Sequence, residues 1–416
     1  MTVPRLRTRL RVAYIDHCAQ LSGAQLALKR LLDAFDGEVD PTVLLAEDGP
    51  LAASLREGGR AVDVIPWTTA ARRLRGVDIR LASSVVPAAR TAAYARRLGT
   101  RLHQLQPDLV HTNSLKAAVY GPLAARLAGV PVLVQVRDRI TPDFLPTPAR
   151  RLVRLAMGTL PDALAGNETT LPTLGVTRVP QFVIVDPVDP CCFDVAPGPR
   201  PTHPLRVGMV GRIAPWKGQH VFLRAFAQAF PAGDACAVLV GAPLFGEHDY
   251  ERELHALAGT LGIRDRVEFR GFRRDVPAEL QRLDVAVHAS VIPEPFGQVV
   301  TEAMAAGLPV VAARAGGPAR IIDDRRSGLL TPPGDVEALA AALGSLAADP
   351  ELRGRLGQAA RRRARDFSSD VAARQALDAY HSVVALSRSA PFRSAGRTPG
   401  GCSPQARRSP PRTRTS

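Results

Sequence analysis

The feature that most constrains the fold is an alternation of strand and helix patterns that runs along the chain, stops and starts again. The first run opens with the apolar strand RVAYI (11–15) and the helix LALKRLLDAF (26–35). The second run opens with LRVGMVG (205–211) and HVFLRAFAQAF (220–230). Strands separated by helices pair in parallel through right-handed crossovers, so the sequence predicts α/β architecture with two parallel sheets.

The break between the two runs is the proline-rich segment 186–204, in which we expect no regular element. A chain of 416 residues is also too long for one ordinary core, and its 46% hydrophobic residues are enough for two. We therefore expect two Rossmann-like, doubly wound domains that face a central cleft. The expected segments are an N-terminal domain (1–185), the linker (186–204), a C-terminal domain (205–367), a helix that packs back on the first domain (368–387) and a basic tail (388–416).

Cysteine content and hydropathy predict a cytoplasmic protein. The cysteines are odd in number and show neither metal-ligand nor C-x-x-C spacing, which argues against a disulfide framework. Their positions are Cys18, Cys191, Cys192, Cys236 and Cys402. The basic N-terminus runs directly into a strand without the apolar core of a signal peptide, and no run of 18 apolar residues suggests a membrane span.

The net charge of +15 does not by itself indicate a nucleic-acid-binding protein. Seven of these charges belong to the tail, which is rich in Ser, Pro, Gly and Arg and which we expect to be disordered. Only three of the 54 Lys and Arg residues are lysines, a bias better explained by coding composition than by selection for nucleic acid. The position of each lysine is therefore informative.

Two glutamates flank a loop and a helix start in EPFGQVVTEAMAAGLPVVAARAGG (294–317). The apolar spacing predicts a helix over 298–306, with Gly307 as its stop and LPVVAA (308–313) as the next strand. Glu302 then lies in the first turns of the helix, whereas Glu294 lies in the loop that precedes it. Loops that follow strands in α/β sheets are where ligands bind, because backbone N–H groups point there. Taken alone, however, two such acids are better explained as surface residues of a capped helix.

A second constellation follows the first strand of the second half, in GRIAPWKGQ (211–219). Arg212 and Lys217 are flanked by Gly211 and Gly218, which allow the backbone to approach a ligand. Two cations beside a helix start suit a diphosphate. A purely structural role is plausible for Arg212 in so arginine-rich a chain, but less so for one of three lysines.

Together these motifs resemble the retaining glycosyltransferases of family 4, which have the GT-B fold. The resemblance rests on G-R-x(4)-K-G, on E-P-F-G-x(4)-E, and on A-x-G-x-P-V-V-A followed by two glycines, and it covers roughly residues 11–387. The two glutamates match the E-x7-E motif of that family. The resemblance implies transfer of a sugar from a nucleotide diphosphate donor to an acceptor hydroxyl, in glycan, glycolipid or small glycoside biosynthesis.

The same resemblance implies roles for individual residues of the second half. Arg212 and Lys217 would hold the diphosphate, and Glu302 would accept hydrogen bonds from the ribose hydroxyls. Glu294, with the backbone at Phe296 and Gly297, would face the donor sugar. The donor-site residues also include Val276 near the nucleobase, in FRGFRRDV (269–276), and the Gly316–Gly317 loop shapes the same pocket.

In the first half the resemblance is weaker. Gly23 in LSGAQLAL matches the family's glycine-rich loop near the donor phosphate, although it could equally be a simple turn. His111 matches the histidine of D-x-V-H, with a packing role as the alternative. A second family histidine is absent, and Arg137 or Asp138 stands in its place, so Arg137 is a candidate hydrogen-bond donor to the sugar. Arg320 is a further departure, since a glutamate is common there.

The acceptor and the surroundings of the enzyme are less constrained. The resemblance implies a sugar or lipid-linked acceptor, and the arginines of the first half suit peripheral association with the inner membrane surface, although a solvated face is the other reading. These arginines are at positions 72, 73, 75, 80, 90, 96, 97, 101, 150, 151 and 154. We expect no cofactor, no metal requirement and no nucleic-acid partner. The alternatives are another nucleotide-sugar enzyme with this fold, such as an epimerase, and a non-catalytic sugar or nucleotide-binding protein.

Overall fold

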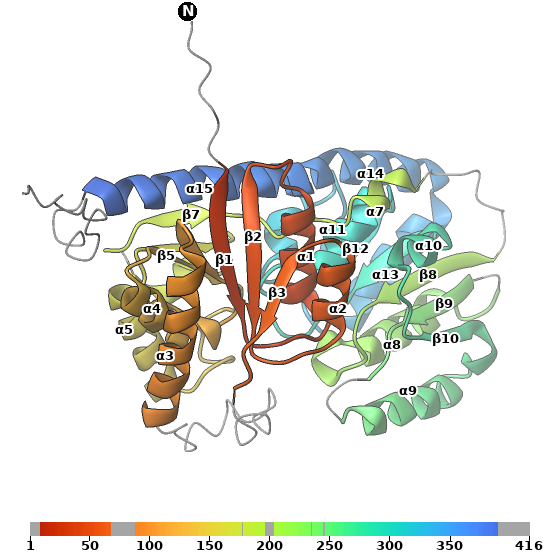
Figure 1. Cartoon of the computed structure of the whole chain (residues 1–416). Helices are drawn as coiled ribbons and strands as arrows, with labels where there is room; N and C mark the ends of the chain where they lie inside the picture. The colour runs from red at the N-terminus through yellow and green to blue at the C-terminus, as the bar shows by residue number, and fades with distance from the viewer. Residues whose placement is uncertain are drawn as a thin grey trace, which may run out of the picture.

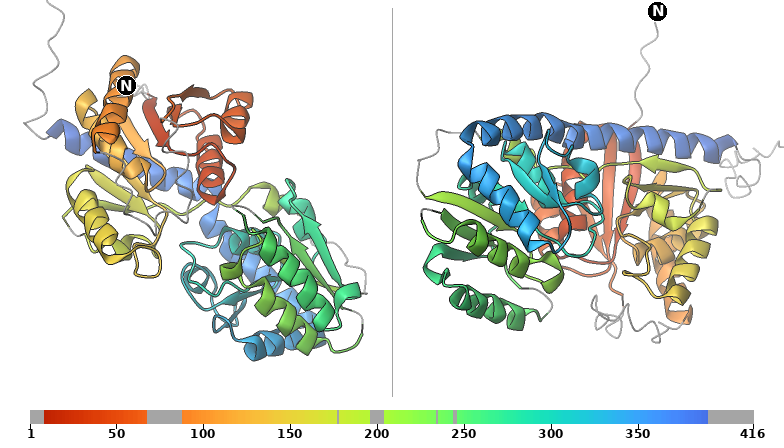
Figure 2. Two further views of the ribbon diagram at one scale, coloured as in Figure 1. Left: turned by 90° about the horizontal axis from the view of Figure 1, so that it is seen from below. Right: turned by 180° about the vertical axis from the view of Figure 1, so that it is seen from behind.

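The computed structural model describes residues 9–67, 88–176, 178–195, 204–233, 235–243 and 246–389. It contains two parallel sheets, each covered by helices, in two lobes joined by short segments (Figures 1 and 2). The expected tail from residue 390 onwards, residues 196–203 of the expected linker and the arginines at 72, 73, 75 and 80 lie outside the described residues.

The first domain is built on a seven-stranded parallel sheet with the order β3-β2-β1-β4-β5-β6-β7. The interior strands β4 and β5 are buried along their whole length, as expected for a sheet with helices on both faces. The elements are β1 (Leu10–Asp16), α1 (Gly23–Asp33), β2 (Val39–Leu45), α2 (Pro50–Glu57), β3 (Ala61–Val64), α3 (Ala88–Leu105), β4 (Leu109–Thr112), α4 (Ala117–Ala128), β5 (Val132–Val136), α5 (Thr147–Thr159), β6 (Ala163–Gly166), α6 (Leu171–Leu174) and β7 (Gln181–Val183).

The second domain repeats this plan with a six-stranded parallel sheet, β10-β9-β8-β11-β12-β13. Its elements are β8 (Leu205–Val210), η1 (Pro215–Lys217), α8 (Gln219–Ala229), β9 (Ala235–Val240), α9 (His248–Thr260), η2 (Arg264–Arg266), β10 (Val267–Gly271), α10 (Val276–Gln281), β11 (Val285–His288), α11 (Gln298–Ala305), β12 (Val310–Ala313), α12 (Pro318–Ile321), β13 (Leu329–Thr331), α13 (Val336–Ala348), α14 (Pro350–Ala364) and η3 (Arg365–Phe367). In both sheets the order of strand addition reverses beside the first strand, between β1 and β4 and between β8 and β11. Ligands of doubly wound sheets bind at such reversal points.

The linker differs from the expectation in one respect. The sequence predicts no regular element in 186–204, yet the short helix α7 (Cys191–Asp194) forms there. Pro190 occupies its N-cap, where a residue without an N–H is harmless because the first amides of a helix have no intrahelical acceptor. The proline-rich composition therefore starts this helix instead of preventing it.

The last helix, α15 (Ser369–Ser389), leaves the second domain and lies along the first (Figures 1 and 2). Its apolar face joins the core on one side of the first sheet, together with Val12 and Tyr14 of β1 and Leu133 of β5. The two chain crossings between the domains are bonded to each other, because Val188 N–H donates to the Phe367 carbonyl at 2.9 Å. Within the described part of the chain, no helix is both long enough and apolar enough to cross a membrane.

Candidate active site at the domain interface

Glu294, in the loop between β11 and α11, is a buried acid of the second domain that three side chains bond. Its Oε1 accepts hydrogen bonds from Lys217 Nζ at 2.7 Å, from His288 Nε2 at 2.9 Å and from the Ser290 hydroxyl. Lys217 ends η1 after β8, and His288 ends β11, so these groups meet at the reversal point of the sheet. Two residues that the sequence pattern placed in separate motifs, Glu294 and Lys217, are therefore in direct contact.

The Glu294 carboxylate is nearly inaccessible to solvent, with 8% of its side chain exposed. Burial alone would raise its pKa, but the Lys217 ammonium and His288 outweigh burial and hold the pKa of Glu294 well below its usual range. The group is thus a fixed negative charge at neutral pH. Because an ammonium has three donors, Lys217 can bond Glu294 and still offer N–H groups to an anion.

Trp216 contacts both of the cations that follow β8. The guanidinium carbon of Arg212 lies 5.3 Å from the centroid of the Trp216 ring, and Lys217 Nζ lies 4.5 Å from it. Both contacts are within the range of cation–π attraction. Arg212 Nε is also 3.3 Å from Glu247 Oε2 at the start of α9. Trp216 thus contacts both cations, while Glu247 pairs with Arg212 and Glu294 with Lys217.

The glycines around Glu294 are required by close backbone packing. Gly317 N–H donates to the Glu294 carbonyl at 2.9 Å, and a Cβ at Gly317 would lie only 1.7 Å from the carbonyl oxygen of Phe296. Gly316 has φ of +60° and a similarly close approach to the Glu294 backbone. The loop of Gly316 and Gly317 thus supports the 294–296 backbone directly.

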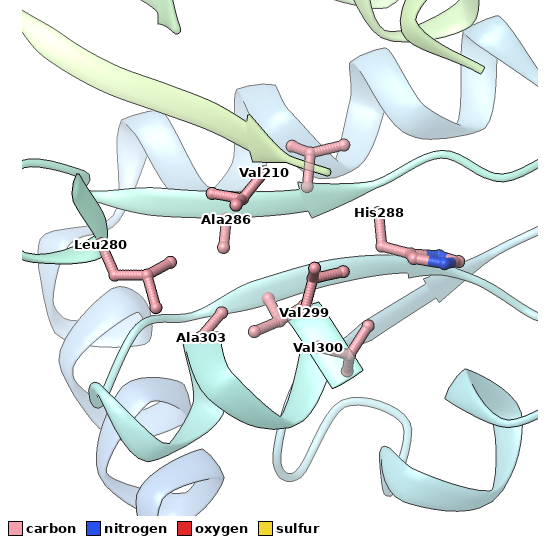
Figure 3. A pocket seen from close by; sticks show the side chains of 9 residues that line it. Val210, Leu280, Ala286, His288, Val299, Val300 and Ala303 are labelled. Carbon is pink, nitrogen blue, oxygen red and sulfur yellow. The ribbon is translucent and has the colours of Figure 1, made fainter. Parts of the chain in front are cut away.

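Helix α11 begins directly after the loop that carries Glu294, and its start is held by packing. Gly297 has φ of +109° and caps the helix, while Phe296 packs edge-on against Phe367 with ring centroids 5.7 Å apart. A small cavity lies between α11 and the sheet, lined mainly by aliphatic side chains of β8, β11, β12, α10 and α11, with His288 at its edge (Figure 3). Val276, at the start of α10, packs against the same core cluster as Phe296. The side chains of Phe296 and Val276 therefore serve packing, and only their backbone or surface atoms remain available to a ligand.

Three first-domain groups contact the 293–298 segment. Gln298 Nε2 donates to the Gly23 carbonyl at 2.8 Å, which brings the glycine loop at the start of α1 against the start of α11. Arg139 Nη1 donates to the Pro293 carbonyl at 3.2 Å, and the Thr169 hydroxyl donates to the Pro295 carbonyl. The segment that carries the first glutamate thus lies at the interface between the two domains.

Glu302, on α11, is also held by the first domain. Its Oε1 is 2.7 Å from Arg30 Nη2 of α1, and the side chains are 7% and 10% exposed. Burial raises the pKa of Glu302, and the Arg30 charge opposes that rise. Arg30 is not among the residues that the sequence pattern singled out.

His111 is in the core of the first domain instead of at an open surface. Its ring is fully buried on β4, and Nδ1 lies 2.7 Å from the Tyr380 hydroxyl of α15. Burial, and secondarily the charge of Arg137, lowers the pKa of His111 to about 3, so the ring is neutral. His111 thus packs under α15, and its predicted role in catalysis stays a prediction.

Arg137, the predicted hydrogen-bond donor to the sugar, lies in a buried network of the first domain, and its contact with a sugar stays a prediction. Its guanidinium is buried after β5, where Nη1 pairs with Asp186 of the linker and Nε donates to Asn113 Oδ1 at 2.8 Å. Asn113 in turn donates to Asp16 at 2.6 Å, at the end of β1. Arg137 therefore ties three strand ends of the first sheet to the linker.

Sequence reasoning missed several groups that complete the site, because none occupies a fixed position of a motif that we recognised. These residues are Trp216, His288, Ser290, Gln298, Arg139, Thr169 and Arg30. Trp216 and Gln298 stand beside residues that were identified, and that position is the one signal that could have pointed to them. No group of three or more His, Cys, Asp or Glu side chains suited to a metal ion occurs among the residues that the structure describes.

Two family models match the chain, one on each domain. Residues 45–163 match a glycosyl transferase 4-like domain, and residues 194–363 match the group 1 glycosyl transferases. The second match contains Arg212, Lys217, Glu294 and Glu302.

Relatives with similar sequences are glycosyltransferases by name. A D-inositol 3-phosphate glycosyltransferase from Salinispora tropica is 33% identical over 319 residues, which are 68% of this chain and 65% of that protein. The match thus spans slightly less than two thirds of that relative. A 2-deoxystreptamine glucosyltransferase from Streptomyces kanamyceticus is 32% identical over 275 residues, which are 58% of this chain and 69% of that protein.

Among solved structures, Anabaena HepE, crystallised with UDP and glucose, superposes with a TM-score of 0.75 at 27% identity. The superposition covers 90% of this chain and all of HepE, including both domains. Fold, sequence relatives and family models agree, and the chain belongs to the family 4 glycosyltransferases with the GT-B fold.

Proposed function

We propose that the protein is a retaining glycosyltransferase that moves a sugar from a nucleotide diphosphate to an acceptor hydroxyl at the interface of its two domains. The observation that carries this proposal is the buried Glu294–Lys217 pair at the reversal point of the second sheet, in contact with the first domain through its loop. An isolated surface acid would need neither this burial nor three donors on one oxygen.

In the proposed reaction, the bond between the anomeric carbon and the diphosphate oxygen breaks while the acceptor oxygen bonds to the same face of that carbon. The hydroxyl proton passes to the departing diphosphate, so the products are a glycoside and a nucleoside diphosphate. Lys217 and Arg212 would stabilise the negative charge that grows on the leaving group. Interactions that strengthen as this charge develops raise the rate.

We assign the remaining donor contacts as follows. Glu294 would accept from a sugar hydroxyl, with the Phe296 and Gly297 backbone beside it, and Glu302 would accept from the ribose. Gly23 would bring a backbone N–H near the diphosphate, a proposal supported by its contact with Gln298. For Val276, a position near the nucleobase remains a prediction. Since two cations serve the diphosphate, we also propose that the enzyme needs no metal, and loss of turnover in EDTA would contradict this.

The donor nucleotide is best sought among uridine diphosphate sugars, because HepE was crystallised with UDP and with UDP-glucose. The relatives act, by their names, on D-inositol 3-phosphate and on 2-deoxystreptamine, so polyhydroxylated cyclitols are the first acceptors to test. We propose that the acceptor enters from the first-domain side, across the groups at the ends of β1, β4 and β5.

The surface of α5 supports peripheral membrane association of the first domain. Leu152 and Leu155 are 67% and 65% exposed, and the arginines Arg151 and Arg154 beside them are exposed as well. Apolar side chains flanked by cations suit an anionic lipid surface, because the leucines can enter the headgroup region while the arginines bind phosphate. A lipid-linked acceptor would fit such a position.

Nucleoside diphosphate release tests the proposal directly. Purified protein is incubated with UDP-glucose, UDP-galactose or UDP-N-acetylglucosamine and a cyclitol or lipid-linked acceptor, and both released UDP and the anomeric configuration of the product are measured. We expect release that depends on the acceptor and a product that keeps the donor configuration. A product of inverted configuration would contradict retention, and conversion of the donor to an epimer would favour the epimerase alternative.

A further inference from the structure

We propose that Arg30 of the first domain is a positioning residue for donor binding, which fixes the Glu302 carboxylate of the second domain so that it meets the ribose of the nucleotide. This inference rests on the proposed function, because it assumes that Glu302 faces a ribose. It adds that the ribose contact depends on both domains.

The geometry of Arg30 suits this role. Its Nη2 lies 2.7 Å from Glu302 Oε1 and 3.3 Å from Asp189 Oδ2, while Nη1 donates to the Pro187 carbonyl at 3.4 Å. Two of these acceptors belong to the linker, so the segment that joins the domains fixes the direction of the guanidinium. The pair uses only Oε1 of Glu302, and a carboxylate has enough lone pairs to accept further hydrogen bonds from hydroxyls.

The helices that carry the pair also meet at a second point. α1 begins at Gly23, whose carbonyl accepts from Gln298 at the start of α11. Arg30 lies two helical turns further along α1, and Glu302 lies one turn further along α11. Contacts at both places fix the mutual orientation of α1 and α11, and therefore the direction of the Glu302 side chain.

Arg30 also favours the charged form of Glu302. The ionisable groups facing Glu302 in the described part of the chain are Arg30 on α1, Asp189 before α7 and Cys192 on α7. Burial and Asp189 favour the neutral acid, and burial raises the pKa of the Cys192 thiol so far that it stays neutral. Arg30 is then the one cation of this set, and its removal would raise the pKa of Glu302 further. A protonated carboxyl is a weaker acceptor for ribose hydroxyls than a carboxylate.

A comparison of UDP with 2′-deoxy-UDP isolates the ribose contact. Dissociation constants for both are measured by calorimetry on the full chain between pH 6 and pH 9. For the wild type we expect 2′-deoxy-UDP to bind about tenfold or more weakly, because it lacks a hydroxyl that bonds a charged acceptor. For Arg30→Met and Arg30→Gln we expect this ratio to fall below about threefold at pH 7 and to recover as the pH rises. Arg30→Lys keeps the charge, so we expect its ratio to be independent of pH.

The controls distinguish a positioning role of Arg30 from a general loss of the folded structure. Lys29→Met removes a neighbouring cation on the same helix, whose pair with Asp33 is partly exposed, and should leave the ratio unchanged. A variant counts as folded if its affinity for 2′-deoxy-UDP and its melting profile are unchanged. The test needs only one of Arg30→Met and Arg30→Gln to be folded. If the folded variant keeps the wild-type ratio of the two dissociation constants at every pH, Arg30 does not have the proposed role. Tighter UDP binding by the variant would also overturn the proposal, because Arg30 would then compete with the ribose for Glu302. A wild type that binds UDP and 2′-deoxy-UDP equally would overturn the ribose assignment of Glu302 itself.

Discussion

Replacing Lys217 by methionine tests whether the buried pair with Glu294 is the centre of the site. The substitution removes an ammonium 2.7 Å from a carboxylate of which 8% is exposed, while the methionine retains most of the volume. Removing one partner of a buried ion pair costs about 3–5 kcal/mol, because the other charge is left without compensation. His288 and Ser290 still donate to Glu294, so we expect the free energy of unfolding of the second domain to fall by about 2–3 kcal/mol at pH 7.

The pH dependence of the stability difference provides a second test. In the wild type the pKa of Glu294 is lowered, so its stabilising contribution is present above the unfolded pKa of about 4.3 and is lost as the pH falls through the folded pKa. The difference in stability between wild type and Lys217→Met should therefore be largest at neutral pH and shrink below about pH 4. Urea denaturation followed by tryptophan fluorescence, at pH 7 and at pH 3, measures both values.

The matched control is Lys29→Met, which makes the same substitution in a partly exposed pair with Asp33. Exposed pairs contribute about 0–1 kcal/mol, so this variant should stay close to the wild type. Equal losses for the two variants, or a Lys217→Met loss that does not change with pH, would refute the view that Lys217 compensates a buried Glu294 charge.

Three further outcomes are expected. Gly317→Ala would place a Cβ 1.7 Å from the Phe296 carbonyl oxygen, so the loop must move and nucleotide affinity should fall at least tenfold in calorimetry, whereas unchanged affinity would show that this loop is not part of the site. The pKa of His111 is lowered to about 3, so between about pH 6.5 and pH 3 the unfolded chain binds a proton that the folded chain does not. The free energy of unfolding should therefore decrease as the pH is lowered through this range, and His111→Phe should reduce that slope by up to about 1.4 kcal/mol per pH unit. An unchanged slope would contradict the assignment. The double substitution Leu152→Ser, Leu155→Ser should weaken sedimentation with anionic vesicles at least fivefold without changing donor binding, and equal sedimentation would leave α5 as a solvated face.

The parts of the fold that the sequence predicted are those with long, regular patterns. The strand of 205–211 and the helix that follows correspond to β8 and α8, and the helix of 298–306 corresponds to α11. Strands β6 and β7 were not identified, because ALAG and QFV contain too few residues for a periodic pattern to appear. Helix α7 was excluded by its prolines, although proline is tolerated where a helix starts.

In the site, likewise, residues within motifs could be predicted and their distant partners could not. Motif residues that lie near each other in sequence could be recognised, and Lys217 and Glu294 do meet in space. The partner of Glu302 could not be predicted, since Arg30 is 272 residues away and is one of many arginines. His111 has the expected position at the end of a strand, but whether its ring faces the site or the core depends on Tyr380 of the last helix. Contacts of this range follow from the packing of the two domains, which a linear pattern does not encode.

The central claim, that the domain interface binds a nucleotide sugar through Lys217 and Glu302, is tested most directly by thermal denaturation with ligands. UDP, GDP, ADP and their common sugar conjugates are added to the wild type, to Lys217→Ala and to Glu302→Ala. We predict that one nucleotide series, UDP first, raises the melting temperature of the wild type and that both substitutions abolish the rise. No rise with any nucleotide, or a rise that survives both substitutions, would contradict the assignment.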